Sequence, residues 1–309
     1  MHAAQPPVSG RGPGTGAVPP SALAIGAMLS VQLGSALSVH LISTVGPAGT
    51  AWLRLTAGAV IFLAVARPPL RSLRRHDAPV LVGLGITTGV QTIAFLAAIE
   101  RIPLGTSVAI EFLGPMTVAA VCSHSRRALV WVGAAGVGVV LVTEPWRGTI
   151  DVAGVGYAAL AAVGWASYIL LTQRVGDRFT GLTGLACTIP IAAVTAAVIG
   201  IPQAAGHLTP AVIATAVGLA IRLPVVPYSL ELLALRRMTP TAFGTLMALE
   251  PAFGVLLGLF VLHQTLSAVQ VVGILLVVLA GAAAQRGGRR RASVDEATAP
   301  PPGAGPVPF

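Results

Sequence analysis

Two glutamates that lie beside prolines are the residues of this sequence best placed to do chemistry. Glu111 and Glu250 each fall well inside a stretch of about 20 apolar residues. Pro251 follows Glu250 directly, and Pro115 lacks the N–H that would otherwise bond to the carbonyl of Glu111. A carboxyl group so placed is costly and normally faces a cavity or a partner. We therefore expect both carboxyls to reach one central cavity, with a structural Glu–Arg pair or a protonated, hydrogen-bonded carboxyl as the alternatives.

Other polar and aromatic side chains in apolar stretches are candidates for contact with a bound solute. Arg54 is suited to a carboxylate, because a guanidinium makes two parallel hydrogen bonds to it. Neutralising Glu111 and extending towards the outer water are the other interpretations of Arg54. Trp165 and Tyr168 are three residues apart and share a helix face. The remaining candidates are Gln32, Tyr228 and Glu231. Helix packing or interface anchoring is the alternative for each of these three and for Trp165 and Tyr168.

Several kinds of chemistry are excluded by the motifs that the sequence lacks. It has neither the Walker A pattern of an ATP site nor the His-Glu-x-x-His pattern of a zinc protease. The two cysteines, Cys122 and Cys187, form neither a disulfide framework nor a metal site. We therefore expect no cofactor, no metal and no enzymatic activity. Movement of a solute without ATP must be driven by a gradient.

The elements that must position these residues are long apolar helices. Each stretch is close to the ~20 residues that a helix needs to cross a ~30 Å hydrocarbon core, and a helix satisfies its own backbone there. Only 9% of the residues are charged, against about 25% in soluble domains. The ten stretches are 21–40, 47–66, 78–98, 104–122, 128–143, 152–173, 182–201, 210–233, 240–262 and 267–285.

The distribution of the basic residues predicts the orientation in the membrane. All 19 are arginines. With ten spans and a cytoplasmic N-terminus, 15 of them fall in inner loops and tails, and only Arg101 and Arg147 fall in outer loops. This bias places both termini in the cytoplasm. Because the arginines are spread over loops and a tail, they do not indicate a nucleic-acid partner.

A faint internal repeat divides the spans into two halves. Arg101 and Pro115 recur as Arg237 and Pro251, with the same spacing in each half. Five spans per half force the second copy to lie inverted in the membrane, an arrangement typical of transporters. The expected fold is an all-α membrane protein with ten transmembrane helices in two inverted five-helix repeats. The repeats cover 21–143 and 152–285, flanked by disordered cytoplasmic tails at 1–20 and 286–309.

Four segments carry a resemblance to a known family. They run from Ile102 to Pro115, from Trp165 to Arg174, from Pro227 to Leu235 and from Phe243 to Pro251. Together they resemble the EamA-type transporters of the drug/metabolite transporter superfamily, and within these the inner-membrane exporters of threonine and homoserine. The resemblance implies efflux of small amino acids or related metabolites. It also implies site roles for Gln32, Arg54, Glu111, Trp165, Tyr168, Tyr228, Glu231 and Glu250.

The hypothesis is a proton-coupled secondary exporter of small amino acids that works by alternating access in the cell inner membrane. Its partners are the solute, protons and the lipid bilayer. One departure bears on this hypothesis, because His263-Gln264 stands where the family often carries Gly-Glu. Arg222 also occupies a position where a small or apolar residue is expected. An exporter of another metabolite or drug is the first alternative, and a non-transporting membrane scaffold or lipid-handling protein is the second.

Overall fold

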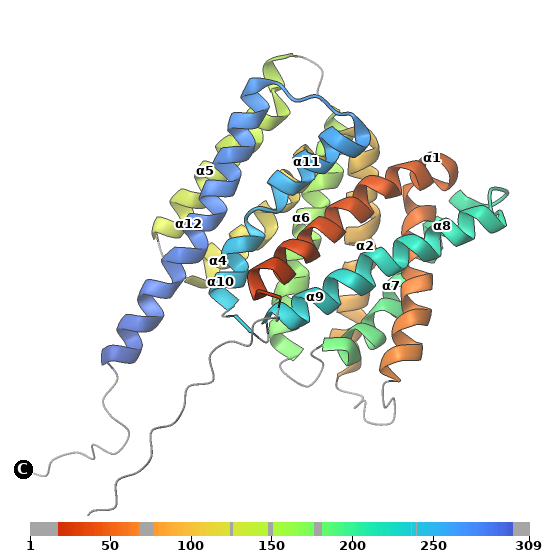
Figure 1. Ribbon diagram of the computed structural model, residues 1–309, viewed down its shortest axis with the longest axis horizontal. Coiled ribbons are helices and arrows are strands. Elements are labelled where there is room, and N and C mark those ends of the chain that lie inside the picture. Colours follow the sequence, from red (N-terminus) through yellow and green to blue (C-terminus); the bar gives the residue numbers. More distant parts are fainter. Residues whose placement is uncertain are drawn as a thin grey trace, which may run out of the picture.

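The protein is a bundle of apolar helices (Figure 1). The computed structural model describes residues 18–67, 77–123, 126–147, 151–175, 181–235, 237–238 and 240–298. All regular structure within these ranges is helical. In chain order, the elements are α1 (Pro20–Ala66), α2 (Ala78–Arg101), α3 (Leu104–Glu111), α4 (Leu113–Ser123), α5 (Arg126–Thr143), η2 (Pro145–Arg147), α6 (Val152–Val175), α7 (Gly181–Ala204), α8 (Pro210–Ala220), η4 (Ile221–Val225), α9 (Val226–Leu235), α10 (Pro240–Met247), α11 (Glu250–Leu262) and α12 (Ala268–Thr298).

Helix α1 contains two of the predicted stretches and bends between them. Gly46 has φ 73° and ψ 170°, a conformation that is essentially restricted to glycine, and Pro47 follows it. The residues on either side of Gly46 are helical, so α1 consists of two arms that meet at a sharp kink. The kink lets two distant parts of one element face the same space.

Three further interruptions lie inside predicted stretches. A turn at Phe112 separates α3 from α4, three residues before Pro115. A turn at 248–249 separates α10 from α11, directly before Glu250. The third interruption is η4, in which Leu223 adopts φ −155° and ψ 110°. Leu223 precedes a proline, and proline disfavours the helical conformation in the residue before it.

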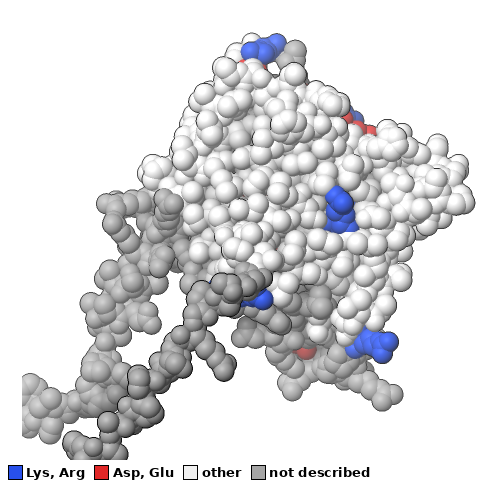
Figure 2. All heavy atoms as spheres, viewed as in Figure 1, with Lys and Arg blue, Asp and Glu red and all other residues white. Residues whose placement is uncertain are grey.

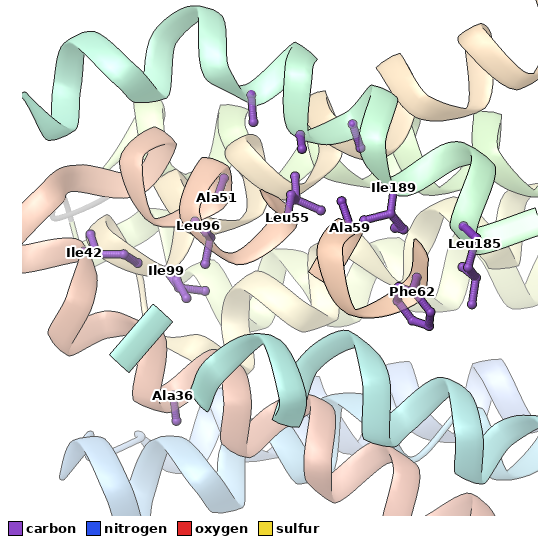
Figure 3. Packing of buried hydrophobic residues seen from close by; sticks show 14 of the residues in the cluster. Ala36, Ile42, Ala51, Leu55, Ala59, Phe62, Leu96, Ile99, Leu185 and Ile189 are labelled. Atoms are coloured by element: carbon purple, nitrogen blue, oxygen red, sulfur yellow. The ribbon is translucent and has the colours of Figure 1, made fainter. Parts of the chain in front are cut away.

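The interior is built largely from small side chains that let helices approach closely. The largest cluster joins α1, α2 and α7 through Ala51, Leu55, Leu96 and Ile189 (Figure 3). At the opposite side of the bundle, α5 packs along α12 (Figure 1). Small residues at helix contacts are typical of membrane bundles, where close van der Waals packing stabilises association.

The length and composition of the helices confirm the membrane class. Seven of the described helices are long and apolar enough to cross a membrane. Two further apolar helices, Pro210–Leu223 and Ala268–Ala284, are shorter. Figure 2 shows a broad surface of uncharged residues, with charged side chains mainly towards its two ends. The chain is therefore a multi-pass membrane protein.

The two tails expected at the ends of the chain lie largely outside the described residues. This applies to 1–17 and 299–309. The described part differs from the expectation at one point, because α12 continues to Thr298 instead of ending near 285. Arginine and alanine recur in this extension, and both have high helix propensity.

At one end of the bundle, hydrogen bonds join the first and second halves of the chain; we call it the capped end. Oε1 of Gln203 accepts from the backbone N–H groups of Ala48, at 2.7 Å, and of Gly49, at 3.0 Å. Oε1 of Gln264 accepts from the N–H of Leu104 at 3.0 Å. Each glutamine therefore satisfies the start of a helix that belongs to the other half.

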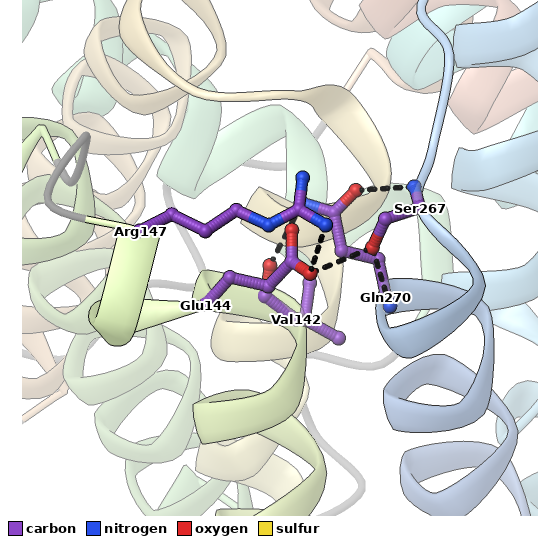
Figure 4. Close-up of polar contacts among 5 residues, drawn as sticks. All are labelled: Val142, Glu144, Arg147, Ser267 and Gln270. Atoms are coloured by element: carbon purple, nitrogen blue, oxygen red, sulfur yellow. Dashed lines mark hydrogen bonds and ion pairs between the residues drawn. The ribbon is translucent and has the colours of Figure 1, made fainter.

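A polar cluster extends the capped end between α5 and α12 (Figure 4). The hydroxyl of Ser267 donates to the carboxylate of Glu144 at 2.8 Å, and Arg147 pairs with the same carboxylate at 3.2 Å. Nε2 of Gln270 donates to the carbonyl of Val142 at 3.1 Å. These bonds again join the first half of the chain to the second.

The loop before α6 carries a further ion pair. Arg101 lies 3.4 Å from the carboxylate of Asp151, which also accepts from the N–H of Gly154 at 2.8 Å. The Gly154 N–H and the Arg101 guanidinium hold the pKa of Asp151 below its usual value. The Asp151 carboxylate, which links α6 to Arg101 of α2, therefore stays ionised through the neutral pH range.

Candidate functional site

A cavity of about 290 Å³ lies inside the bundle. Six elements bring polar side chains to it: both arms of α1, together with α2, α3, α6, α9 and α11. Seven of the side chains singled out from the sequence line it, namely Gln32, Arg54, Glu111, Trp165, Tyr168, Glu231 and Glu250. The eighth, Tyr228, has a side chain outside the described part of the structure, although its neighbour Pro227 lines the cavity.

The helix interruptions explain how the two central glutamates reach the cavity. Glu111 is the last residue of α3, and Glu250 is the first residue of α11. Both side chains are buried, with 8% and 5% of their surface exposed. The start of a helix stabilises a carboxylate, which favours the position of Glu250 at the start of α11. The ring of Trp165 packs edge-on against Phe112 at the turn between α3 and α4, with centroids 6.4 Å apart.

The two glutamates differ in their hydrogen bonds. Oε1 of Glu111 accepts from Nε2 of Gln91 on α2 at 3.1 Å. Oε2 of Glu250 is buried and has no hydrogen-bond partner among the described residues. A buried polar atom without a partner is costly, and in a cavity it indicates where a ligand or water binds. Glu250 is therefore the carboxyl group more available to a solute.

Arg54 is the only cation among the described residues that line the cavity. Its Nη1 donates to the hydroxyl of Ser38 at 2.8 Å, whereas its Nε is buried without a partner in the described structure. Neither of the ion pairs found among the described residues involves Arg54. Oε1 of Gln32 is likewise buried and unpartnered in this part of the chain. The cavity therefore presents one guanidinium and several acceptor oxygens to whatever occupies it.

Several lining residues were not predicted as site residues from the sequence. They include Ser35 on α1 and a face of α2 formed by Thr88, Gln91, Thr92 and Phe95. A signal for this face exists, because these four residues follow the i, i+3, i+4, i+7 pattern of one helix surface. Three of the four are polar, and polar side chains at that spacing in an apolar stretch indicate the face of α2 that lines the cavity.

Arg222 lies apart from the site. It belongs to η4, its side chain is exposed, and it does not line the cavity. Its backbone carbonyl accepts a hydrogen bond from the hydroxyl of Ser30 at 2.9 Å, which joins η4 to the first arm of α1. The neighbouring Leu223 does reach the cavity.

Comparisons with known proteins agree with this description. The sequence model of the EamA-like transporter family matches residues 152–283. The threonine/homoserine exporter RhtA of Salmonella typhimurium strain LT2 is 34% identical over 252 residues, which cover 80% of this chain and 85% of that protein. RhtA of Escherichia coli strain K12 is 33% identical over 265 residues, covering 82% and 87%.

Two more distant proteins are also similar. Protein PecM of Dickeya dadantii is 27% identical over 244 residues, covering 72% of this chain and 77% of PecM. A solved crystal structure superimposes with a TM-score of 0.59 at 20% identity, covering 88% of this chain and 99% of that one. At this identity, the structural likeness supports the fold alone.

Proposed function

Because this chain belongs to the EamA-like transporter family, we propose that it is a secondary active exporter of small amino acids similar to threonine and homoserine. The chain is a multi-pass protein of the cell inner membrane. The observation that carries the proposal is the cavity, in which Arg54 and Glu250 each have a buried atom without a partner in the described structure. A zwitterion supplies a partner for both, since its carboxylate fits the guanidinium and its ammonium fits the carboxyl group.

The size of the cavity favours a small solute. Pockets that hold drug-sized ligands usually measure about 300–1,000 Å³, and this one is about 290 Å³. An amino acid with a short hydroxylated side chain is small enough for it, with Trp165 and Tyr168 as the aromatic wall. The relatives that carry the name threonine/homoserine exporter support the same solute class.

We assign proton coupling to Glu111 and the ammonium contact to Glu250. Glu111 is held by Gln91, and Glu250 has the unpartnered oxygen. Moving one charge across 100 mV yields about 2.3 kcal/mol. Since about 1.4 kcal/mol corresponds to a tenfold concentration ratio, one proton per cycle can sustain a roughly fifty-fold gradient of a solute that moves as a neutral species.

For the topology we propose ten spans in two inverted five-helix repeats, with both termini in the cytoplasm. Counting the two arms of α1 separately and including the two shorter apolar helices supports this number. Helices α3 and α10 both have 8 residues, and the same offset separates their first residues and their last residues. The family match at 152–283 falls on the proposed second repeat.

In alternating access the two halves separate at one end at a time, and hydrogen bonds join them at the capped end. The arginine distribution makes the capped end the outer one. Release to the outside therefore breaks the hydrogen bonds of Gln203 and Gln264. The same residues line the cavity whether it opens to the inside or to the outside.

Transport by purified protein in liposomes tests the proposal. Labelled threonine and homoserine are expected to move faster when a proton gradient is imposed than when it is collapsed. A panel of other metabolites and drugs, used as competitors, distinguishes an amino-acid exporter from an exporter of another solute. A complete absence of solute flux would support a scaffold or lipid-handling protein instead.

A further inference from the structure

Arg54 donates a hydrogen bond to Ser38, a residue that does not line the cavity. Ser38 lies on the first arm of α1 and Arg54 on the second, so the kink at Gly46 brings them together. The Ser38 hydroxyl accepts from Nη1 of Arg54 at 2.8 Å and donates to the backbone carbonyl of Gly34 at 2.6 Å. Ser38 is fully buried. Its donor and one of its acceptor sites are therefore already assigned.

This arrangement determines which edge of the guanidinium is available. Nη1 lies on the same side of the group as Cδ, so the N–H groups of Nε and Nη2 point along the opposite edge. Nε of Arg54 is buried with no partner among the described residues. The Nε–Nη2 edge makes two parallel hydrogen bonds to a carboxylate, which is the strong, geometrically specific mode of arginine recognition.

We propose that Ser38 is a positioning residue that turns the Nε–Nη2 edge of Arg54 towards the cavity, so that the site selects solutes that carry a carboxylate. This inference rests on the proposed export of amino acids and narrows it. An arginine has many rotamers, and holding one of them in advance reduces the entropy lost when the solute binds. The neutral acceptors of a sugar or nucleobase bind this edge more weakly than a carboxylate does, because a charge-assisted hydrogen bond is roughly twice as strong.

Counterflow of labelled threonine in proteoliposomes tests the inference. Ser38→Ala is expected to raise KM for threonine about tenfold, equivalent to roughly 1.4 kcal/mol, with little change in kcat. Inhibition by threoninamide, which lacks the carboxylate, is expected to stay unchanged. Ser38→Thr keeps the hydroxyl and should restore the wild-type KM. In an Arg54→Gln background, Ser38→Ala should have no further effect on KM.

Ser43→Ala is the matched control. Ser43 lies on the same arm of α1, and its hydroxyl also donates to a backbone carbonyl, that of His40, at 2.7 Å. It should leave KM unchanged. If Ser38→Ala does not reach the membrane, Ser38→Cys carries the test, because sulfur is a weak acceptor.

The outcomes distinguish a failure of the proposed role of Ser38 from a failure of the proposed function. A wild-type KM in Ser38→Ala or Ser38→Cys, or an equal weakening of threonine and threoninamide, would overturn the role of Ser38 while leaving the proposed function intact. Failure of the wild-type protein to transport any amino acid would defeat the proposed function itself, and this inference with it.

Discussion

At the scale of single residues, the charged side chains of the cavity differ in whether their polar atoms have hydrogen-bond partners. Glu111 has a donor in Gln91, whereas Glu250 has a buried oxygen without a partner in the described residues. Arg54 has one partner and one unpartnered nitrogen. A buried polar group without a hydrogen-bond partner costs about 1–3 kcal/mol, and the cost is higher when the group is charged. A protein that tolerates several such groups in one cavity gains when a polar solute satisfies them.

Glu250→Gln is expected to lower threonine efflux at least tenfold with normal expression. The amide keeps the shape of the side chain but removes the charge that we propose binds the ammonium group, and hydrogen bonds to charged groups contribute about 1.5–3 kcal/mol. The measurement is the initial rate of efflux of labelled threonine. Glu100→Gln is the control, because Glu100 is an exposed carboxyl near the end of α2. Wild-type efflux in Glu250→Gln would remove Glu250 from the site.

Glu111→Gln is expected to uncouple efflux from the proton gradient. The glutamine side chain remains able to bond to Gln91 but cannot take up and release a proton. Exchange of threonine for threonine across the membrane should persist, while acceleration by an imposed pH gradient should disappear. A variant that still responds to the gradient like the wild type would show that another group couples transport to protons.

At the scale of elements, helix ends are satisfied by side chains from the opposite half of the molecule. The first N–H of α3, that of Leu104, bonds to Gln264, and the second arm of α1 bonds to Gln203. Every helix leaves N–H groups free at its start, and these need partners when they are buried. The capped end therefore couples the position of one half to that of the other.

Gln264→Ala is expected to destabilise the capped end by about 1–3 kcal/mol, because the N–H of Leu104 loses its acceptor. Gln264→Glu keeps acceptor oxygens and should remain close to wild type. Hydrogen–deuterium exchange at 99–107 measures the effect, with faster exchange expected in Gln264→Ala alone. Equal exchange rates in the alanine and glutamate variants would contradict the capping role.

Gly138→Ala is expected to lower the thermal stability of the α5–α12 pair. A Cβ at Gly138 would lie 2.7 Å from the carbonyl oxygen of Gly273. Overpacking of this kind costs about 1–3 kcal/mol, which outweighs the gain of about 1 kcal/mol in helix propensity. Gly133→Ala is the control on the same helix, because a Cβ there meets no described atom within 4 Å. The measurement is Tm in detergent, and a Tm for Gly138→Ala at or above that of Gly133→Ala would refute the close contact.

The sequence contained enough information to predict the apolar helices and most of the polar cavity residues. Hydrophobic length alone locates the helices, because the bilayer core sets that length. Charged residues in such stretches indicate the cavity, because burial in lipid is costly. The break at Gly46 falls between the first two predicted stretches, 21–40 and 47–66, whereas the break at Leu223, which also adjoins a proline, was not predicted. Proline interruptions in membrane helices depend on neighbouring helices to satisfy the freed backbone groups, and those neighbours are defined only by the fold.

The contacts of the Ser38 and Gln91 side chains could not be predicted from the sequence either. A serine or glutamine in an apolar stretch is ambiguous, because it can bond to its own helix or to a neighbour. What distinguishes Ser38 is its contact with a residue on the other arm of α1. Sequence spacing could not predict this contact without the kink.

At the scale of the whole molecule, the proposed orientation follows from the arginines and makes a direct prediction. In a background with Cys122→Ser and Cys187→Ser, Trp146→Cys should react with a membrane-impermeant maleimide in intact cells, and Arg237→Cys should not. Both positions are exposed. The reverse labelling pattern would invert the topology and would place the capped end at the cytoplasmic side.

The central claim is that the cavity moves an amino acid in exchange for a proton, and liposome transport measures this most directly. Purified protein is reconstituted, and flux of labelled threonine and homoserine is followed with and without an imposed pH gradient. The expected result is saturable flux that the gradient accelerates and that falls at least tenfold in Glu250→Gln. Flux that ignores the gradient and is unchanged in both glutamate variants, or no flux of any amino acid, would contradict it.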